Sequence, residues 1–184
     1  MQITSFSTDR YTVRPWRSAL SDPAARADLE TALARILTPE VLAHLPPSLT
    51  LGPGDRVADW IDAREAESDV LTVTTARDGE LIGLVILAQD PDAALPTVHL
   101  GYLFAKSVWG RGAASEVVTG LVQSLRASAS IRLIGGVPYW DYGLQQVRAL
   151  AMARGIALAV LPGDGRPDAR LDALSTLPVS TLRR

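Results

Sequence analysis

The stretch from Leu100 to Glu116 constrains the fold more than any other part of the chain. An alternating apolar run ends here in Gly110-Arg111-Gly112, and an amphipathic helical pattern starts directly after it. A strand, a glycine turn and a helix N-terminus in this order form an anion site, because the first N–H groups of a helix have no partner within it. Glycine also lets the backbone approach a phosphate closely. The stretch therefore predicts a phosphorylated ligand at this bend.

Hydrophobic periodicity predicts an α/β (α+β) fold in which helices lie on both faces of a mixed sheet. The expected strands span 11–14, 70–76, 81–88, 97–104, 131–137, 156–161 and 169–176. The expected helices are one that starts at Pro23 after a cap at Ser21 or Asp22, one capped by Asp55, and two over 113–126 and 141–154. Asp78-Gly79 indicates a hairpin turn. Because a helix separates 97–104 from 131–137, these two strands are expected to be parallel.

Composition excludes several classes of protein. The chain has 184 residues, 47% of them hydrophobic, which predicts one domain over residues 1–184 with its own core. With 18 basic and 20 acidic side chains it has no basic excess, so we expect no nucleic-acid partner. The longest apolar run, 81–88, is too short for a membrane span, and cysteine is absent, which excludes disulfides and thiolate metal sites. Without a secretory signal at its start, the protein is expected to be cytoplasmic.

Three kinds of phosphate ligand compete for the glycine bend. A Walker loop needs Gly-x-x-x-x-Gly-Lys-Ser/Thr, which the chain does not contain. A dinucleotide fingerprint needs a third glycine where Ser115 stands, and an acidic residue where the next strand ends in Gly135-Gly136-Val137. The third candidate is an acyl-coenzyme A.

Four sequence motifs support that third candidate. Asp9–Trp16 is similar to the opening "dRLxLRpw", and Gly79–Gly83 to the hairpin "g.liGxi". Leu100–Leu103 is similar to "lGYwl", and Trp109–Glu116 to "yWGkGyatEa". Through these motifs the chain resembles the GNAT superfamily of N-acetyltransferases, in the branch of the ribosomal-protein alanine acetyltransferases, over residues 9–161. The resemblance implies a mostly antiparallel sheet with one splayed parallel strand pair. It also implies transfer of an acetyl group from acetyl-CoA to a primary amine of a small molecule or a protein N-terminus.

The chain departs from the family pattern in two places. Ser107 stands where the pyrophosphate motif has Gln or Arg. On the helix expected over 141–154, Leu144 and Val147 occupy the positions of the family's Asn and Ser, or Asp141 lies near the Asn position in a second alignment. These departures leave open an alternative function, a non-catalytic acyl-CoA-binding or interaction domain.

The resemblance also implies which residues bind the cofactor. Backbone N–H groups near Leu103 and Phe104 would face the thioester oxygen. Asp141 would contact the pantetheine from the following helix. The diphosphate would lie on the backbone of the bend, where Arg111 adds positive charge; the residues concerned are Trp109, Gly110, Arg111, Gly112, Ala113 and Ala114.

His99 is the candidate general base, because it stands where the branch often carries Glu, two residues before the glycine of "lGYwl". Imidazole can take up a proton at cellular pH. Strand alternation places His99 on one face with Gly101 and Leu103; a hydrogen-bonded histidine in a half-buried strand is the equally weighted structural alternative. Tyr142 is the candidate acid for the thiolate, with Tyr139 as a second choice.

Two further carboxylate and imidazole side chains have simpler interpretations. Glu116, in the first turn of the expected helix, suits the helix dipole without any chemistry. His44 lies in a proline-rich connector and is expected at the surface. The first two helices and the loops are expected to select the amine acceptor, and an exposed sheet edge favours a homodimer.

Overall fold

A computed structural model describes residues 4–45, 47–90, 97–124, 132–137 and 157–162. Its strands are β1 (Phe6–Ser7), β2 (Tyr11–Pro15), β3 (Asp69–Thr75), β4 (Leu81–Asp90), β5 (Thr97–Phe104), β6 (Arg132–Val137) and β7 (Ala157–Pro162). Its α-helices are α1 (Arg17–Leu20), α2 (Pro23–Ile36), α3 (Pro39–Leu42), α4 (Val57–Glu67) and α5 (Ala113–Ser124). Short 3-10 turns are η1 (Pro47–Leu49) and η2 (Lys106–Val108).

The sheet places its strands in sequence order from β1 to β7. Neighbouring strands from β1 to β5 pair antiparallel, whereas β5 pairs with β6 and β6 with β7 in parallel. The β5–β6 register runs from Thr97 opposite Arg132 to Leu100 opposite Gly135, while β5 continues to Phe104. The predicted fold class, a mostly antiparallel sheet with helices on both faces, is confirmed. The splay of the two parallel strands stays a prediction.

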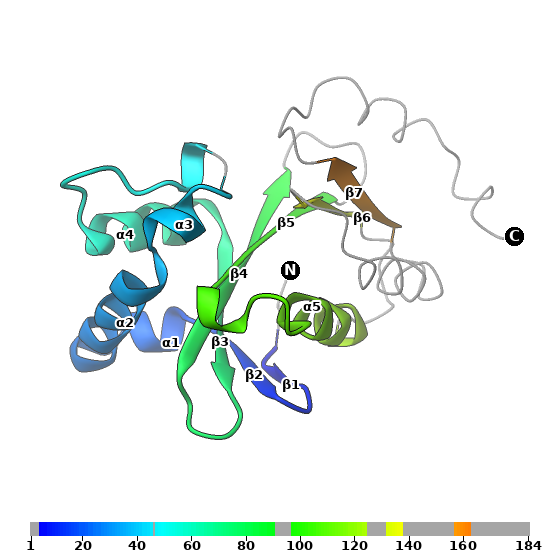
Figure 1. The fold of residues 1–184 in the computed structure, drawn as a ribbon, viewed down its shortest axis with the longest axis horizontal. Coiled ribbons are helices and arrows are strands. Elements are labelled where there is room, and N and C mark those ends of the chain that lie inside the picture. Colours follow the sequence, from blue (N-terminus) through cyan, green and yellow to red (C-terminus); the bar gives the residue numbers. More distant parts are fainter. Residues whose placement is uncertain (1–3, 46, 91–96, 125–131, 138–156, 163–184) are drawn as a thin grey trace, which may run out of the picture.

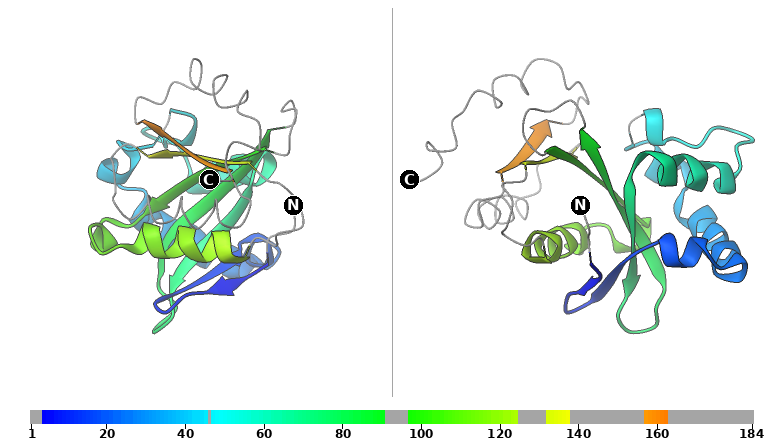
Figure 2. Two further views of the ribbon diagram at one scale, coloured as in Figure 1. Left: turned by 90° about the vertical axis from the view of Figure 1, so that its right-hand side faces the viewer. Right: turned by 180° about the vertical axis from the view of Figure 1, so that it is seen from behind.

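Helices cover the two faces of the sheet unequally, as Figures 1 and 2 show: α1 to α4 lie on one face and α5 on the other. Strand β5 contributes to both cores. Its buried Leu100 and Phe104 pack with the buried side of α5, and Leu103 packs with the core under α2 and α4. Strands β3 and β4 contribute to both cores in the same way, so the sheet separates the two layers.

Local signals explain most helix and turn positions. Asp22 caps α2 by accepting hydrogen bonds from the N–H groups of Ala24 and Ala25 at 2.8 and 3.2 Å, as predicted. The predicted cap at Asp55 is wrong: Arg56 holds the N-cap position of α4, and the Asp55 carboxylate accepts instead from Gly52 N at 2.6 Å.

Some of the other predicted elements are found in the structure, and others lie outside the described residues. Strand 97–104 is found at its predicted bounds, and the strands over 11–14, 70–76 and 81–88 shift by one or two residues. The helix predicted over 113–126 is described up to Ser124. The elements predicted over 141–154 and 169–176 lie outside the described residues. Among the helices that the structure describes, none has both the length and the apolar character that crossing a membrane requires.

Helix α5 approaches the β1–β2 hairpin closely at Gly120. A Cβ atom at this position would lie 2.7 Å from Phe6 Cε2 and 2.8 Å from Thr8 Cγ2, both shorter than normal contacts. Glycine inside a helix lowers stability by about 1 kcal/mol relative to alanine. The close packing of α5 on the hairpin, which a larger residue would prevent, must contribute more than this.

The Glu116 carboxylate joins the same hairpin to the first turn of α5. Oε1 accepts from Thr8 Oγ1 at 2.6 Å and from Arg10 N at 3.0 Å, and Oε2 accepts from Arg10 Nε at 2.6 Å. Partial burial acts to raise the pKa of the Glu116 carboxyl, but the hydrogen bonds from Thr8 and Arg10 outweigh it and the pKa lies below its ordinary value of 4.5. This network supports the structural interpretation of Glu116.

Replacing Gly120 with alanine is expected to destabilise the protein. Overpacking costs about 1–3 kcal/mol, more than the gain in helix propensity. Urea unfolding of Gly120→Ala measures the change, and Thr119→Ala in the same helix is the matched control, which should be neutral or slightly stabilising. Equal stability of the two variants would contradict the close contact.

Glu116→Gln is expected to lower the free energy of unfolding by about 1 kcal/mol at pH 7, because a half-exposed charge-assisted network is lost. A carboxylate with a lowered folded-state pKa stabilises the fold above the unfolded pKa and loses that effect as pH falls through the folded value. The difference between wild type and Glu116→Gln should therefore shrink below about pH 4.5. Denaturant unfolding from pH 7 down to about pH 3 tests this, with Glu80→Gln as control; a constant difference over that range would contradict it.

Candidate functional site

The bend between η2 and α5 has the backbone geometry of an anion site. Gly110 and Gly112 have φ values of +70° and +73°, in the left-handed region that favours glycine. Glu116 N donates to Gly112 O at 3.1 Å and begins the helical ladder, so the N–H groups of Ala113 and Ala114 precede it. A Cβ atom on Gly110 would meet no atom within 4 Å. The bend thus combines an exposed, close-approach backbone with the positive end of a helix.

Arg10 supports this bend from behind. Its Nη2 donates to the carbonyl oxygen of Arg111 at 3.0 Å, while its Nε binds Glu116. The Arg111 side chain is itself exposed. The exposed Arg111 guanidinium favours an anion at the bend, whereas the Arg10 charge is already paired with Glu116. Sequence reasoning missed Arg10, although it belongs to the Asp9–Trp16 motif.

The end of β5 is fixed by its contact with β4. Ala105 N donates to Ile82 O at 2.8 Å, and in an antiparallel pair such bonds recur at every second residue. The N–H of Leu103 is therefore directed to β4, and the N–H of Phe104 is directed to the β6 side. A Cβ on Gly83 would overlap Leu103 O and lie 2.7 Å from Phe104 Cδ1, which explains the glycine of the hairpin motif.

Trp109 connects the bend to this strand end. Its indole Nε1 donates to Phe104 O at 2.8 Å, and its side chain remains 40% exposed. The ring of His44 meets the Trp109 ring edge-on, with 5.4 Å between centroids. The sequence prediction that His44 lies at the surface is correct, but its position beside the bend was not foreseen.

Helix α3 makes a second contact with the bend through an ion pair of Glu40 with Lys106, whose nearest atoms are 3.4 Å apart. Hydrogen bonds from the backbone of Glu40 and from Thr38, with the Lys106 charge, lower the pKa of the exposed Glu40 carboxyl. Together with His44, this pair brings the helices of the predicted acceptor side to the predicted cofactor loop.

His99 lies in the half of β5 that pairs with two neighbours, opposite Ala88 on β4 and Ile134 on β6. It is half-buried, and it alternates onto the face of Leu103, as predicted. At about 3.3 Å per residue, His99 and Phe104 are separated by about 16 Å along the strand. Proton transfer to this imidazole from an amine near Phe104 would thus pass through water.

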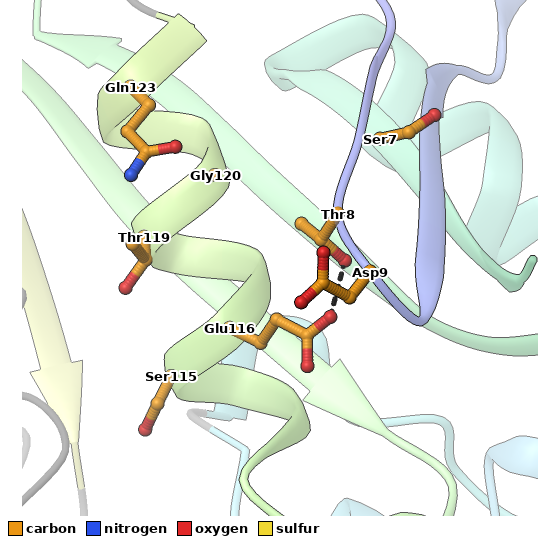
Figure 3. A pocket seen from close by; sticks show the side chains of 8 residues that line it. All are labelled: Ser7, Thr8, Asp9, Ser115, Glu116, Thr119, Gly120 and Gln123. Atoms are coloured by element: carbon orange, nitrogen blue, oxygen red, sulfur yellow. Dashed lines mark hydrogen bonds between the residues drawn. The ribbon is translucent and has the colours of Figure 1, made fainter.

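A polar groove lies elsewhere on α5, against the β1–β2 turn (Figure 3). It encloses about 540 Å³. Its lining residues are Ser7, Thr8, Asp9, Ser115, Glu116, Thr119, Gly120 and Gln123. The groove contains neither His99 nor the bend glycines, and the Glu116 carboxylate in it is already bound by the hairpin. We therefore place the site at the bend and not in this groove.

Two of the predicted site residues, Asp141 and Tyr142, lie outside the described residues.

Within the part of the chain that the structure does describe, no group of three or more His, Cys, Asp or Glu side chains is arranged to hold a metal ion.

Comparisons with known proteins agree with this geometry. Residues 17–153 match the family described as "Acetyltransferase (GNAT) domain". Among solved structures, the ribosomal-protein-S5-alanine acetyltransferase from Vibrio fischeri is similar at a TM-score of 0.55 and 13% identity, over 79% of this chain and 80% of that one. A GNAT-family acetyltransferase from Bacillus anthracis gives a TM-score of 0.47 and 11% identity, over 65% and 64%. At 13% identity the likeness to the Vibrio fischeri structure shows the fold alone.

One curated protein, the aerobic cobaltochelatase subunit CobN of Pseudomonas aeruginosa, is 48% identical over 54 residues. That match covers 29% of this chain and 4% of CobN, so the chain spans a small part of that relative. The match to the GNAT acetyltransferase domain over residues 17–153 covers well over half of the chain. The chain therefore belongs to the GNAT acetyltransferase family.

Proposed function

We propose that this protein transfers an acetyl group from acetyl-CoA to a primary amine. The observation that carries the proposal is the bend, where two left-handed glycines and the first amides of α5 present an open backbone to an anion. This fits the diphosphate of coenzyme A, and the exposed Arg111 guanidinium adds to the attraction. The bound coenzyme supplies an activated acyl carbon.

The end of β5 would orient the reacting carbonyl. The Phe104 N–H points away from β4, so it can donate to the acyl oxygen as negative charge develops there. Leu103 N–H is turned to β4, so of the two predicted donors the geometry favours Phe104. Leu103 then contributes its side chain to the acceptor-side core.

The proton of the amine would go to His99. The amine nitrogen bonds to the acyl carbon, the carbon–sulfur bond breaks, and His99 takes the amine proton through a chain of several water molecules. The departing thiolate takes a proton from an acid, for which Tyr142 stays the candidate. Water is required because His99 and Phe104 lie far apart on β5.

The acceptor would enter from the side of α2 to α4, which faces His99. The likeness to a ribosomal-protein alanine acetyltransferase makes a peptide with a free N-terminus the first acceptor to test, beside small-molecule amines. We propose a cytoplasmic protein that forms homodimers and binds neither nucleic acid nor membranes.

The alternative function, a non-catalytic acyl-CoA-binding domain, is favoured by one local feature. Ser107, where the family pattern has Gln or Arg, is exposed on η2 and its short side chain carries no charge. Binding of acetyl-CoA without thioester consumption over a panel of amines would select this alternative.

Gly110→Ala is expected to weaken coenzyme A binding about tenfold or more, because a left-handed alanine costs about 1–2 kcal/mol and its Cβ enters the space of the diphosphate. The matched control is Gly79→Ala, at a similar φ of +74° and also with no atom within 4 Å of the added Cβ. Both variants should lose similar folding stability, but only Gly110→Ala should lose affinity by calorimetry. Equal affinity in both would refute the bend as the anion site.

His99→Ala is expected to lower kcat by about 100-fold, the low end of the contribution of a general base, without changing coenzyme affinity. Tyr102→Phe, on the opposite face of β5, is the control and should retain turnover. A thioester-consumption assay measures both variants. Normal turnover in His99→Ala would leave the histidine with its structural role only.

A further inference from the structure

Trp109 is the large hydrophobic side chain that the described part of the chain leaves most exposed. Its indole N–H nevertheless has a specific partner, the carbonyl oxygen of Phe104 at 2.8 Å. Because 40% of the Trp109 side chain stays exposed, packing against the core does not by itself explain the position of this residue. The position of its acceptor atom does.

The N–H and C=O of one residue in an antiparallel strand point to the same side. Because the Phe104 N–H is directed away from β4, the Phe104 carbonyl is also directed away from β4, to the β6 side. A bare carbonyl at this place would repel the acyl oxygen that the neighbouring N–H is proposed to bind. The indole N–H occupies that carbonyl, and so the end of β5 offers a donor without a competing acceptor.

His44 holds the indole from its other side. The two rings meet at an interplanar angle of 71° with 5.4 Å between centroids, an edge-to-face contact. His44 follows α3, which belongs to the acceptor-side layer. Trp109 therefore touches the coenzyme bend, the strand end and the acceptor-side connector with one side chain.

We propose that Trp109 is a positioning residue, which covers the Phe104 carbonyl and sets the distance between the bend and the end of β5. This inference rests on the proposed function. In the proposed complex with acetyl-CoA, the bend holds the diphosphate, and Trp109 determines whether the acyl group reaches the Phe104 N–H in the productive orientation.

The test is Trp109→Phe, which keeps an aromatic ring beside His44 and removes only the donor. We expect kcat to fall about tenfold, while the Kd of coenzyme A and the melting temperature remain close to those of wild type. The ratio of the Kd values for acetyl-CoA and coenzyme A is a second readout that needs no turnover, and it should shift against acetyl-CoA. Glu40→Gln is the control, because it weakens the other contact between α3 and the bend and should change none of these values.

The outcomes separate the two proposals. If wild type is active and Trp109→Phe matches it within twofold in kcat and in the Kd ratio, the role of Trp109 is refuted and the transferase function stands. If wild type consumes no thioester but Trp109→Phe still shifts the Kd ratio, the transferase function fails and Trp109 positions the acyl group in a binding domain. A wild type that binds neither ligand refutes both.

Discussion

The position of the bend depends on the Glu116 carboxylate. Three donors from Thr8 and Arg10 hold it, and Arg10 extends from there to the carbonyl of Arg111. The N-terminus of α5 is thus attached to the β1–β2 hairpin, which is itself part of the sheet. On the opposite side, Trp109 attaches the bend to the end of β5. A backbone that must receive a charged ligand without rearranging needs such anchors at both ends, because glycines at positive φ impose little stiffness of their own.

The sequence predicted those features that depend on neighbouring residues. Alternation located 97–104 as a strand and assigned His99 to the face of Leu103, and the glycine spacing located the bend. A cap at Ser21 or Asp22 followed from the polar residues directly before Pro23, and Asp22 is the one that caps α2. Each of these rests on a period or a short-range hydrogen bond, which a single sequence contains.

Contacts between distant segments could not be predicted in this way. Arg10 and Glu116, or His44 and Trp109, are brought together only by the sheet order and the path of α3. Asp55 shows that short-range signals also compete: its carboxylate satisfies Gly52 N, so the helix begins one residue later without a side-chain cap. The sequence identified Gly83 as part of a motif but gave no reason for a glycine there. The reason is its close contact with Leu103 and Phe104 on the neighbouring strand.

Strand β5 gives the proposed chemistry its geometry. Its final amide and its histidine lie on the same strand but about 16 Å apart, and they point in different directions: the amide lies in the plane of the sheet, the imidazole off the acceptor face. If His99 is the base, the proton of an amine that attacks near Phe104 has to travel along the acceptor face of β5. The buried Leu103 lies between these two points. Because an apolar side chain cannot carry a proton, the relay would have to pass around Leu103, and the helices proposed to select the acceptor would then also determine how readily it loses its proton.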